Sequence, residues 1–481
     1  MPLVAGVDTS TQSCKIVVRD AETGALVRSG SAKHPDGTEV DPRHWWDAFQ
    51  EAAAAAGGLS DVAAISVGGQ QHGMVTLDAD GNVVRPALLW NDTRSAPQAA
   101  ALTAALGGPA AWTARTGSVP VASMTASKWQ WLRENEPETA AATAAIRLPH
   151  DFLTERLTGV AVTDPGDASG TCWYSTATGA YDPELLELLG LEPALLPEVA
   201  TTGAALAGSL TAEAARTLGL PAGIAVAAGT GDNMSAAVGL GLGGAGLLDH
   251  PVLSLGTSGT VFAASGTRPA SAALSGFAAA DGTYLPLACT LNCTLAVDKV
   301  AALLGLDRND TAPGGEAVLL PYLDGERTPD LPTASGLLTG LRHDTTPQQL
   351  LGAAYEGAVV TVLRALDELL LACGLDPADP EVAARPLRLI GGGAQGHAWV
   401  ETVRRLSGRP VVVPGSGELV ALGAAALAQA AATGQDPVAI ATAWDTGDDT
   451  RLPSVERDTE TWERVGSVLE RAAQPLLGGV N

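Results

Sequence analysis

Short hydrophobic runs bounded by polar turns alternate along the chain with segments rich in alanine and leucine. The clearest predicted strands span residues 3–7, 14–19, 62–67, 226–228 and 387–390. Between and after them lie helical stretches, such as the one from Gly423 onward. Strands interleaved with helices predict α/β domains with largely parallel sheets.

The first strand pair has a counterpart in mid-chain. The first pair encloses a polar turn at residues 8–13, and the second, from Val252 to Ala264, encloses the turn at 256–260. Two hairpins with small hydroxylated tips, one near the start of each half, predict a duplicated domain. We place the boundary in the glycine-rich segment after Gly239, which gives domains 1–245 and 246–481.

Composition limits the classes of partner. The formal net charge of −25 would repel a phosphate backbone, so no nucleic-acid partner is expected. The five cysteines are scattered, as in a reduced compartment, and no apolar run approaches the ~20 residues of a membrane helix. The amino terminus enters a strand without a basic region or cleavage site. We therefore expect a cytoplasmic globular protein, monomer or homodimer, without a membrane partner.

The hairpin tips are candidate phosphate sites, because backbone N–H groups and hydroxyls can converge there on one anion. A single tip of this kind is more often an ordinary polar turn, but two of them could grip a polyphosphate from both sides. Asp8 stands at a strand end, where a carboxylate could hold Mg²⁺ through water. Lys15 could reach a phosphate or remain a solvated strand residue.

Asp232 is the most informative acid. It follows the small residues Gly229, Thr230 and Gly231 and precedes Asn233, at the point where a strand gives way to a helix. Asp is a common helix cap, and alone that interpretation would be preferred. Beside phosphate-binding hairpins, the same carboxylate becomes a candidate base for an attacking hydroxyl.

Two glycine patterns fit G-x-G-x-x-G. The pattern at 239–244 follows a predicted helix and has no preceding strand, so it is expected to be a loop. The pattern at 391–396 follows a strand and precedes a helix, which keeps a Rossmann site open, although no complete βαβαβ half follows it. Such a turn can also let adenosine lie against bare backbone. The G-x-x-x-x-G-K-[ST] loop and the protein-kinase signatures are absent.

Two longer motifs carry a resemblance to a known family. Residues 123–135 read SMTASKWQWLREN, and the run from Gly336 through Gly340 to Glu356 forms the second motif. Over essentially its full length the chain resembles the FGGY family of carbohydrate kinases. The resemblance implies an α/β fold of two actin-like (ribonuclease H-like) ATPase domains, with an interdomain cleft that closes over the sugar.

Within the family, residues 68–73, 89–94 and 320–329 are most similar to the branch of bacterial xylulokinases. The likeness implies that Asp232 is the general base, that Asp8 is the second catalytic acid, and that both hold the metal. The residues it implies for the ligands are Gln71, His72, Asp232 and Asn233 for the sugar, Thr11, Lys15, Gly256 and Thr257 for phosphate, and Gly392, Gly393 and Ala394 for adenosine.

The resemblance also implies the reaction, which is transfer of phosphate from ATP with Mg²⁺ to D-xylulose. The chain departs from the family at Ser10 and Ser13, where glycines are common, and at Gln71, where many xylulokinases have methionine. L-Ribulose, gluconate and glycerol therefore remain alternative acceptors. An actin-like ATPase without a small-molecule acceptor is the alternative from another class, and the segments around His72 and Asp232 argue against it.

Overall fold

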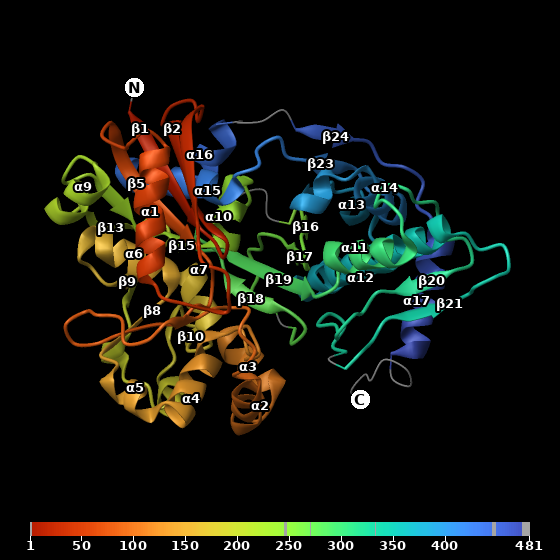
Figure 1. Ribbon diagram of the computed structural model, residues 1–481, viewed down its shortest axis with the longest axis horizontal. Coiled ribbons are helices and arrows are strands. Elements are labelled where there is room, and N and C mark those ends of the chain that lie inside the picture. Colours follow the sequence, from red (N-terminus) through yellow and green to blue (C-terminus); the bar gives the residue numbers. More distant parts are fainter. Residues whose placement is uncertain (1, 245–247, 270, 332, 445–448, 474–481) are drawn as a thin grey trace. The chain divides into compact units, whose positions relative to one another are not determined.

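The computed structural model describes residues 2–244, 248–269, 271–331, 333–444 and 449–473 (Figure 1). Contacts divide the chain into two compact units. Unit 1 comprises residues 1–245, 264–285 and 416–446, and unit 2 comprises residues 246–263, 286–415 and 447–481. The predicted boundary between residues 245 and 246 lies outside the described residues. Among those described, no helix is long and apolar enough to cross a membrane.

Unit 1 is built on a mixed sheet with the strand order β13-β14-β5-β1-β2-β3, and β15 pairs with β5. The strands are β1 (Leu3–Thr9), β2 (Ser13–Asp20), β3 (Leu26–Lys33), β5 (Val62–Gly69), β13 (Leu206–Ser209), β14 (Ala225–Ala227) and β15 (Thr230–Gly231). Strands β1, β5 and β14 are parallel neighbours, whereas the β1–β2, β2–β3 and β13–β14 pairs are antiparallel.

The sheet of unit 2 repeats this arrangement in the order β19-β17-β16-β22-β23-β24. Its strands are β16 (Val252–Leu255), β17 (Gly259–Phe262), β19 (Tyr284–Thr290), β22 (Leu387–Ile390), β23 (Val411–Val413) and β24 (Thr450–Leu452). Again an antiparallel hairpin precedes a parallel neighbour, β22 beside β16. The expected duplication is confirmed. The expectation of largely parallel sheets is wrong, because the three-residue tips can join only antiparallel strands.

Helices cover both faces of the unit 1 sheet. On one face lie α1 (Arg43–Ala55), α6 (Pro149–Thr158) and α9 (Ala212–Leu218), where Trp45, Phe49 and Phe152 join the buried core. On the other lie α10 (Asp232–Gly239), α15 (Leu419–Thr433) and α16 (Pro437–Trp444). A Cβ on Gly6 would stand 1.9 Å from the carbonyl oxygen of Ala421, so the glycine lets α15 lie directly against β1.

Smaller elements complete unit 1. The helices are α2 (Ala96–Ala105), α3 (Pro109–Thr116), α4 (Thr125–Asn135), α5 (Pro137–Ala142), α7 (Pro165–Ala168) and α8 (Pro183–Leu189), with the 3-10 turns η1 (Ser169–Thr171) and η2 (Pro193–Leu195). The short strands are β4 (Glu39–Val40), β6 (Val75–Leu77), β7 (Ala87–Leu88), β8 (Ala145–Arg147), β9 (Val162–Thr163), β10 (Tyr174–Ser175), β11 (Ala180–Tyr181), β12 (Glu198–Val199) and β18 (Ser275–Ala278).

In unit 2 the long helix α12 (Pro347–Ala372) forms the centre of the packing. It contacts α11 (Thr294–Leu304), α14 (His397–Ser407), α17 (Thr459–Ala472) and strands β17 and β20 (Val318–Leu320), which pairs with β21 (Leu337–Thr339). Short helix α13 (Pro380–Ala383) and the 3-10 turn η4 (Gly392–Gln395) flank β22. Thr346 and Gln349 form a capping box that starts α12, within the second family motif.

Candidate active site

Asp8 lies at the end of β1, where its backbone pairs with that of Lys15 on β2. The side chain is buried, and its Oδ1 accepts hydrogen bonds from the backbone N–H of Ser10, at 3.0 Å, and from the Ser10 hydroxyl. Burial raises the pKa of Asp8 to about 6, although these bonds and Lys15 oppose the shift. Ser10, which departs from the family pattern, thus supplies a donor to the carboxylate that a glycine could not.

The other phosphate candidates of this hairpin already have partners. The Nζ of Lys15 lies 2.9 Å from Oε2 of Glu418, in an ion pair whose side chains are both partly exposed. The hydroxyl of Thr11 accepts a hydrogen bond of 2.8 Å from the indole nitrogen of Trp90, which is 43% exposed. Each contact is accessible to solvent, so an incoming phosphate group can compete for Lys15 and Thr11.

The residues predicted to bind the sugar, which lie just after β5 and at the start of α10, are close together in unit 1. Nδ2 of Asn233 donates to Oε1 of Gln71 at 2.8 Å and lies 3.1 Å from Oδ1 of Asp232. Gln71 follows β5 and is buried, whereas Asp232 and Asn233 at the start of α10 keep part of their surface exposed. The structure therefore joins Gln71, Asn233 and Asp232 in one hydrogen-bonded group, although 162 residues separate Gln71 from Asn233.

His72 stands beside this group in an unusual backbone conformation. Its φ is 66°, a left-handed value that is uncommon for a residue with a side chain. The imidazole ring lies 5.6 Å from the ring of Phe277, between centroids, and a Cβ on Gly170 would stand 2.4 Å from it. Backbone strain of this kind persists where the surroundings fix a side chain, and it is frequent in ligand sites.

The environment of Asp232 fits a cation. Burial, and then the nearby carboxylates of Asp8 and Asp167, raise the pKa of Asp232 to about 8. A divalent ion beside Asp8 and Asp232 would remove the repulsion between them, and carboxylate oxygen is the ligand type that Mg²⁺ prefers. Among the described residues, no group of three or more His, Cys, Asp or Glu side chains could by itself hold a metal. Such an ion would thus need water or substrate oxygens as well.

The tip of the second hairpin, residues 256–258, lies in unit 2. Thr257 is exposed between β16 and β17. The carbonyl oxygen of Gly256 accepts hydrogen bonds from the backbone N–H of Thr294, at 3.0 Å, and from its hydroxyl, at 2.8 Å. These bonds tie the tip to the start of α11 and leave the Thr257 side chain free to face a ligand.

Glu326, within the 320–329 segment, supports the loop before α11. Its carboxylate is buried and accepts from the backbone N–H groups of Leu291, Asn292 and Arg327 at 2.5, 3.3 and 2.8 Å. The hydrogen bonds compensate for burying the acid. The segment that resembles xylulokinases therefore fixes the loop that leads into Thr294.

The glycine-rich turn after β22 has an open and a packed position. A Cβ on Gly392 would meet no atom within 4 Å, whereas one on Gly393 would lie 2.7 Å from Cβ of Leu255. Ala394 is buried beside them. Gly392 therefore offers bare backbone to a flat group such as adenosine, and Gly393 allows the turn to lie against β16.

A cavity of about 270 Å³ adjoins the helix that follows this turn. Its wall combines apolar surface with polar and charged residues from α14, α12 and the 309–313 loop: Asn309, Thr311, Glu356, His397, Glu401, Thr402 and Arg405. The helix α14 begins at His397, directly after η4. The cavity is large enough for part of a nucleoside, with donors and acceptors on its walls.

Several buried groups near Asp232 could not be predicted from the sequence. His150, Asp151, Asp164 and Asp167 form a fully buried cluster in unit 1, with His150 Nδ1 lying 3.0 Å from Oδ2 of Asp167. Asp164 also caps α7, and a capping signal was the only local sign of its role. No local pattern marks His150, because two of its three carboxylate partners, Asp164 and Asp167, lie on another segment.

The known proteins that this chain resembles are carbohydrate kinases. The family models described as FGGY family of carbohydrate kinases match residues 3–239 for the N-terminal domain and 252–432 for the C-terminal domain. A xylulose kinase of Streptomyces coelicolor is 58% identical over 99% of this chain and 97% of its own, and one of Escherichia coli is 34% identical over 89% and 90%.

Solved structures give the same result. The crystal structure of xylulose kinase from Bifidobacterium adolescentis is 39% identical, with a TM-score of 0.84, over 97% of this chain and 99% of its own. Both halves of the chain are thus matched by one family, in sequence and in fold. The chain belongs to the FGGY family of carbohydrate kinases.

Proposed function

We propose that this carbohydrate kinase transfers the γ-phosphoryl group of ATP to the terminal hydroxyl of D-xylulose, giving D-xylulose 5-phosphate and ADP. The hydrogen-bonded group of Gln71, Asn233 and Asp232 is the observation that carries the proposal, because it places a carboxylate beside two amides suited to sugar hydroxyls. The 58% identity to a xylulose kinase of Streptomyces coelicolor supports the choice of acceptor.

Asp232 acts as the base. Its carboxylate takes the proton of the attacking hydroxyl as the oxygen bonds to the γ-phosphorus and the bond from phosphorus to the bridging oxygen breaks. Gln71, His72 and Asn233 orient the sugar, and positioning of this kind supplies much of the rate in phosphoryl transfer. Because a site built for particular hydroxyls leaves polar groups unpaired with the wrong sugar, these residues also select the acceptor.

The ligands of the metal and the nucleotide come from this chain's own residues. Asp8 and Asp232 would hold Mg²⁺, which when bound neutralises charge on the phosphate groups. Thr11, Lys15, Gly256 and Thr257 bind phosphate through hydroxyl, ammonium and backbone groups. Gly392, Gly393 and Ala394 support adenosine, and the cavity on α14 supplies polar contacts to the nucleoside.

A panel of acceptors tests the choice of sugar. With saturating ATP and Mg²⁺, D-xylulose is expected to give a higher kcat/KM than L-ribulose, gluconate or glycerol, because their hydroxyl patterns differ from that of D-xylulose. The measurement is ADP release together with identification of the sugar phosphate. A higher value with any of the other three would replace the acceptor and leave the kinase reaction in place.

The same assay separates this proposal from an actin-like ATPase. A kinase forms one sugar phosphate for each ATP consumed, whereas an ATPase without an acceptor forms free phosphate. If free phosphate equalled ADP in the presence of every sugar, the proposal of sugar phosphorylation would be wrong.

Asp8→Asn tests the metal assignment. The amide removes one negative charge but keeps the shape and an acceptor for Ser10. We expect the Mg²⁺ concentration for half-maximal activity to rise by about 10-fold, since a lost charge-assisted ligand contact is worth roughly 1.5 kcal/mol. Titration with Mg²⁺ at saturating ATP and sugar measures it. An unchanged Mg²⁺ dependence would remove Asp8 from the metal site.

A further inference from the structure

The buried cluster of one histidine and three carboxylates in unit 1 has no role in the reaction proposed above. We call His150, Asp151, Asp164 and Asp167 the His150 cluster. Beyond the 3.0 Å contact with Asp167, Nε2 of His150 lies 3.4 Å from Asp151 Oδ1 and 3.7 Å from Asp164 Oδ1. All four side chains are at most 1% exposed.

Such a cluster is costly to bury unless its members compensate one another. Burial alone would lower the pKa of His150, but Asp151, Asp167 and Asp164 reverse the shift and raise it to about 9. The imidazolium therefore pairs with carboxylates that would otherwise repel one another. The cluster is held together as a unit, and substitution of a single member would leave an uncompensated buried charge.

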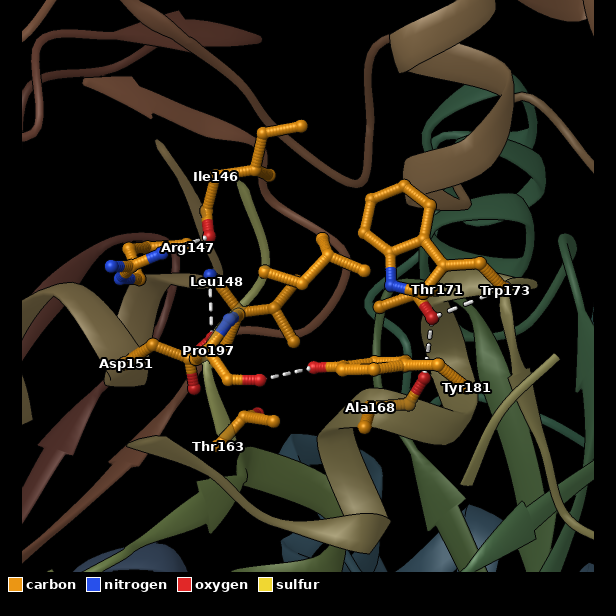
Figure 2. Close-up of a pocket in the computed structure, with 11 residues that line it drawn as sticks. Ile146, Arg147, Leu148, Asp151, Thr163, Ala168, Thr171, Trp173, Tyr181 and Pro197 are labelled. Atoms are coloured by element: carbon orange, nitrogen blue, oxygen red, sulfur yellow. Dashed lines mark hydrogen bonds between the residues drawn. The ribbon is translucent and has the colours of Figure 1, made fainter. Parts of the chain in front are cut away.

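The His150 cluster is not a ligand site. The cavity that Asp151 lines has a volume of about 10 Å³, enough for one water molecule at most. Figure 2 shows Asp151 at its wall, where the carboxylate accepts a hydrogen bond of 2.8 Å from the backbone N–H of Leu148. A role in binding a substrate or an effector at this cavity is therefore excluded by size.

One hydrogen bond connects the cluster to the segment that carries Asp232. The hydroxyl of Thr230 donates to Oδ2 of Asp164 at 2.7 Å, and the backbone N–H of Gly166 donates to the same oxygen at 3.0 Å. Thr230 lies in β15, two residues before Asp232, and is fully buried. The bond thus fixes the strand end from which the helix α10 starts.

Packing connects the cluster to the sugar-binding segment as well. A Cβ on Gly69, the last residue of β5, would stand 3.0 Å from Cβ of His150. A Cβ on Gly229 would stand 3.1 Å from Cδ2 of the same histidine. His150 therefore lies directly against the strand ends that lead to Gln71 and to Asp232.

We propose that Thr230 and Asp164 are positioning residues, and that their hydrogen bond holds the backbone of β15 so that Asp232 stands where it can take the proton of the sugar hydroxyl. The proposal rests on the function proposed above for Asp232. Neither residue touches the sugar, and both act through the position of α10. A small displacement of a catalytic group slows the chemical step more than it weakens binding of the sugar.

Thr230→Val tests the proposal, because valine keeps the shape of threonine and removes only the donor. We expect kcat to fall by about 10-fold, since a small misplacement of a reacting group costs rate. The dissociation constant of the sugar, measured by calorimetry without nucleotide, should change little. Thr230→Ser, which restores the hydroxyl, should recover kcat. Should the valine variant fail to fold, Thr230→Ala takes its place with the same expectation.

Thr361→Val in unit 2 is the matched control. Thr361 is 1% exposed, its hydroxyl donates to the carbonyl oxygen of Gly357 at 2.8 Å and lies 2.9 Å from the hydroxyl of Tyr322, and none of these three residues is assigned to the reaction. It should lose stability without losing kcat. The positioning role is overturned if Thr230→Val keeps wild-type kcat, or if Thr230→Ser falls as far as valine. An active Asp232→Asn enzyme would instead refute the assignment of the base, whichever result Thr230 gives.

Discussion

Replacing Asp232 with asparagine is expected to lower kcat by about 10²–10⁴-fold, the usual contribution of a general base. The amide keeps the size of the side chain and can still accept the hydrogen bond that the backbone N–H of Asn233 donates at 2.8 Å. It cannot accept the proton of the sugar hydroxyl. Steady-state rates with D-xylulose and ATP, together with calorimetric binding of the sugar, separate the loss of chemistry from a loss of affinity.

Two results would contradict this assignment. A fully active Asp232→Asn enzyme would show that another group takes the proton. A large loss of sugar affinity with kcat unchanged would make Asp232 a binding residue alone. Asn233→Ala is a useful comparison, because it removes the amide that donates to Gln71 and adds no charge beside the base. We expect it to raise the sugar KM more than it lowers kcat, since an interaction present in both ground and transition states affects mainly KM.

The parts of the fold that follow from local pattern could be predicted from the sequence. The strand at 387–390 is observed as β22 with the same bounds, and the second hairpin has strands on either side of Thr257. Small residues before Asp232 correctly predicted a strand that gives way to a helix. Alternation of apolar residues and turn chemistry determine such features within a few positions of the chain.

Contacts between distant segments could not be predicted. Lys15 and Glu418 are 403 residues apart, and nothing near either one marks the pair. The residues 264–285 and 416–446 belong to unit 1, although they follow its main segment by many residues. The family resemblance implies a sugar contact for Gln71, but no hydrogen-bond partner for its side chain. Its bond to Asn233 depends on how β5 and α10 meet, which is a tertiary property.

Gly392→Val is expected to raise the KM for ATP by about 10- to 100-fold, because overpacking a close contact costs roughly 1–3 kcal/mol. Its φ lies outside the left-handed range and its Cβ would meet no protein atom, so valine fits the folded chain. Only a ligand lying against the turn would meet the new methyl groups. The KM for sugar and the melting temperature should stay near the wild-type values, and ATP dependence at saturating sugar is the measurement.

A graded series makes this result specific. Gly392→Ala adds one methyl group and should raise the KM for ATP less than valine does. Gly393→Ala serves as the opposite case, because its Cβ would stand 2.7 Å from Cβ of Leu255 and 3.0 Å from its carbonyl oxygen. That variant should lower the melting temperature, since the protein itself must move to accommodate the methyl group. A folded Gly392→Val enzyme with an unchanged KM for ATP would show that adenosine does not lie against this turn, and would move the nucleoside elsewhere in unit 2.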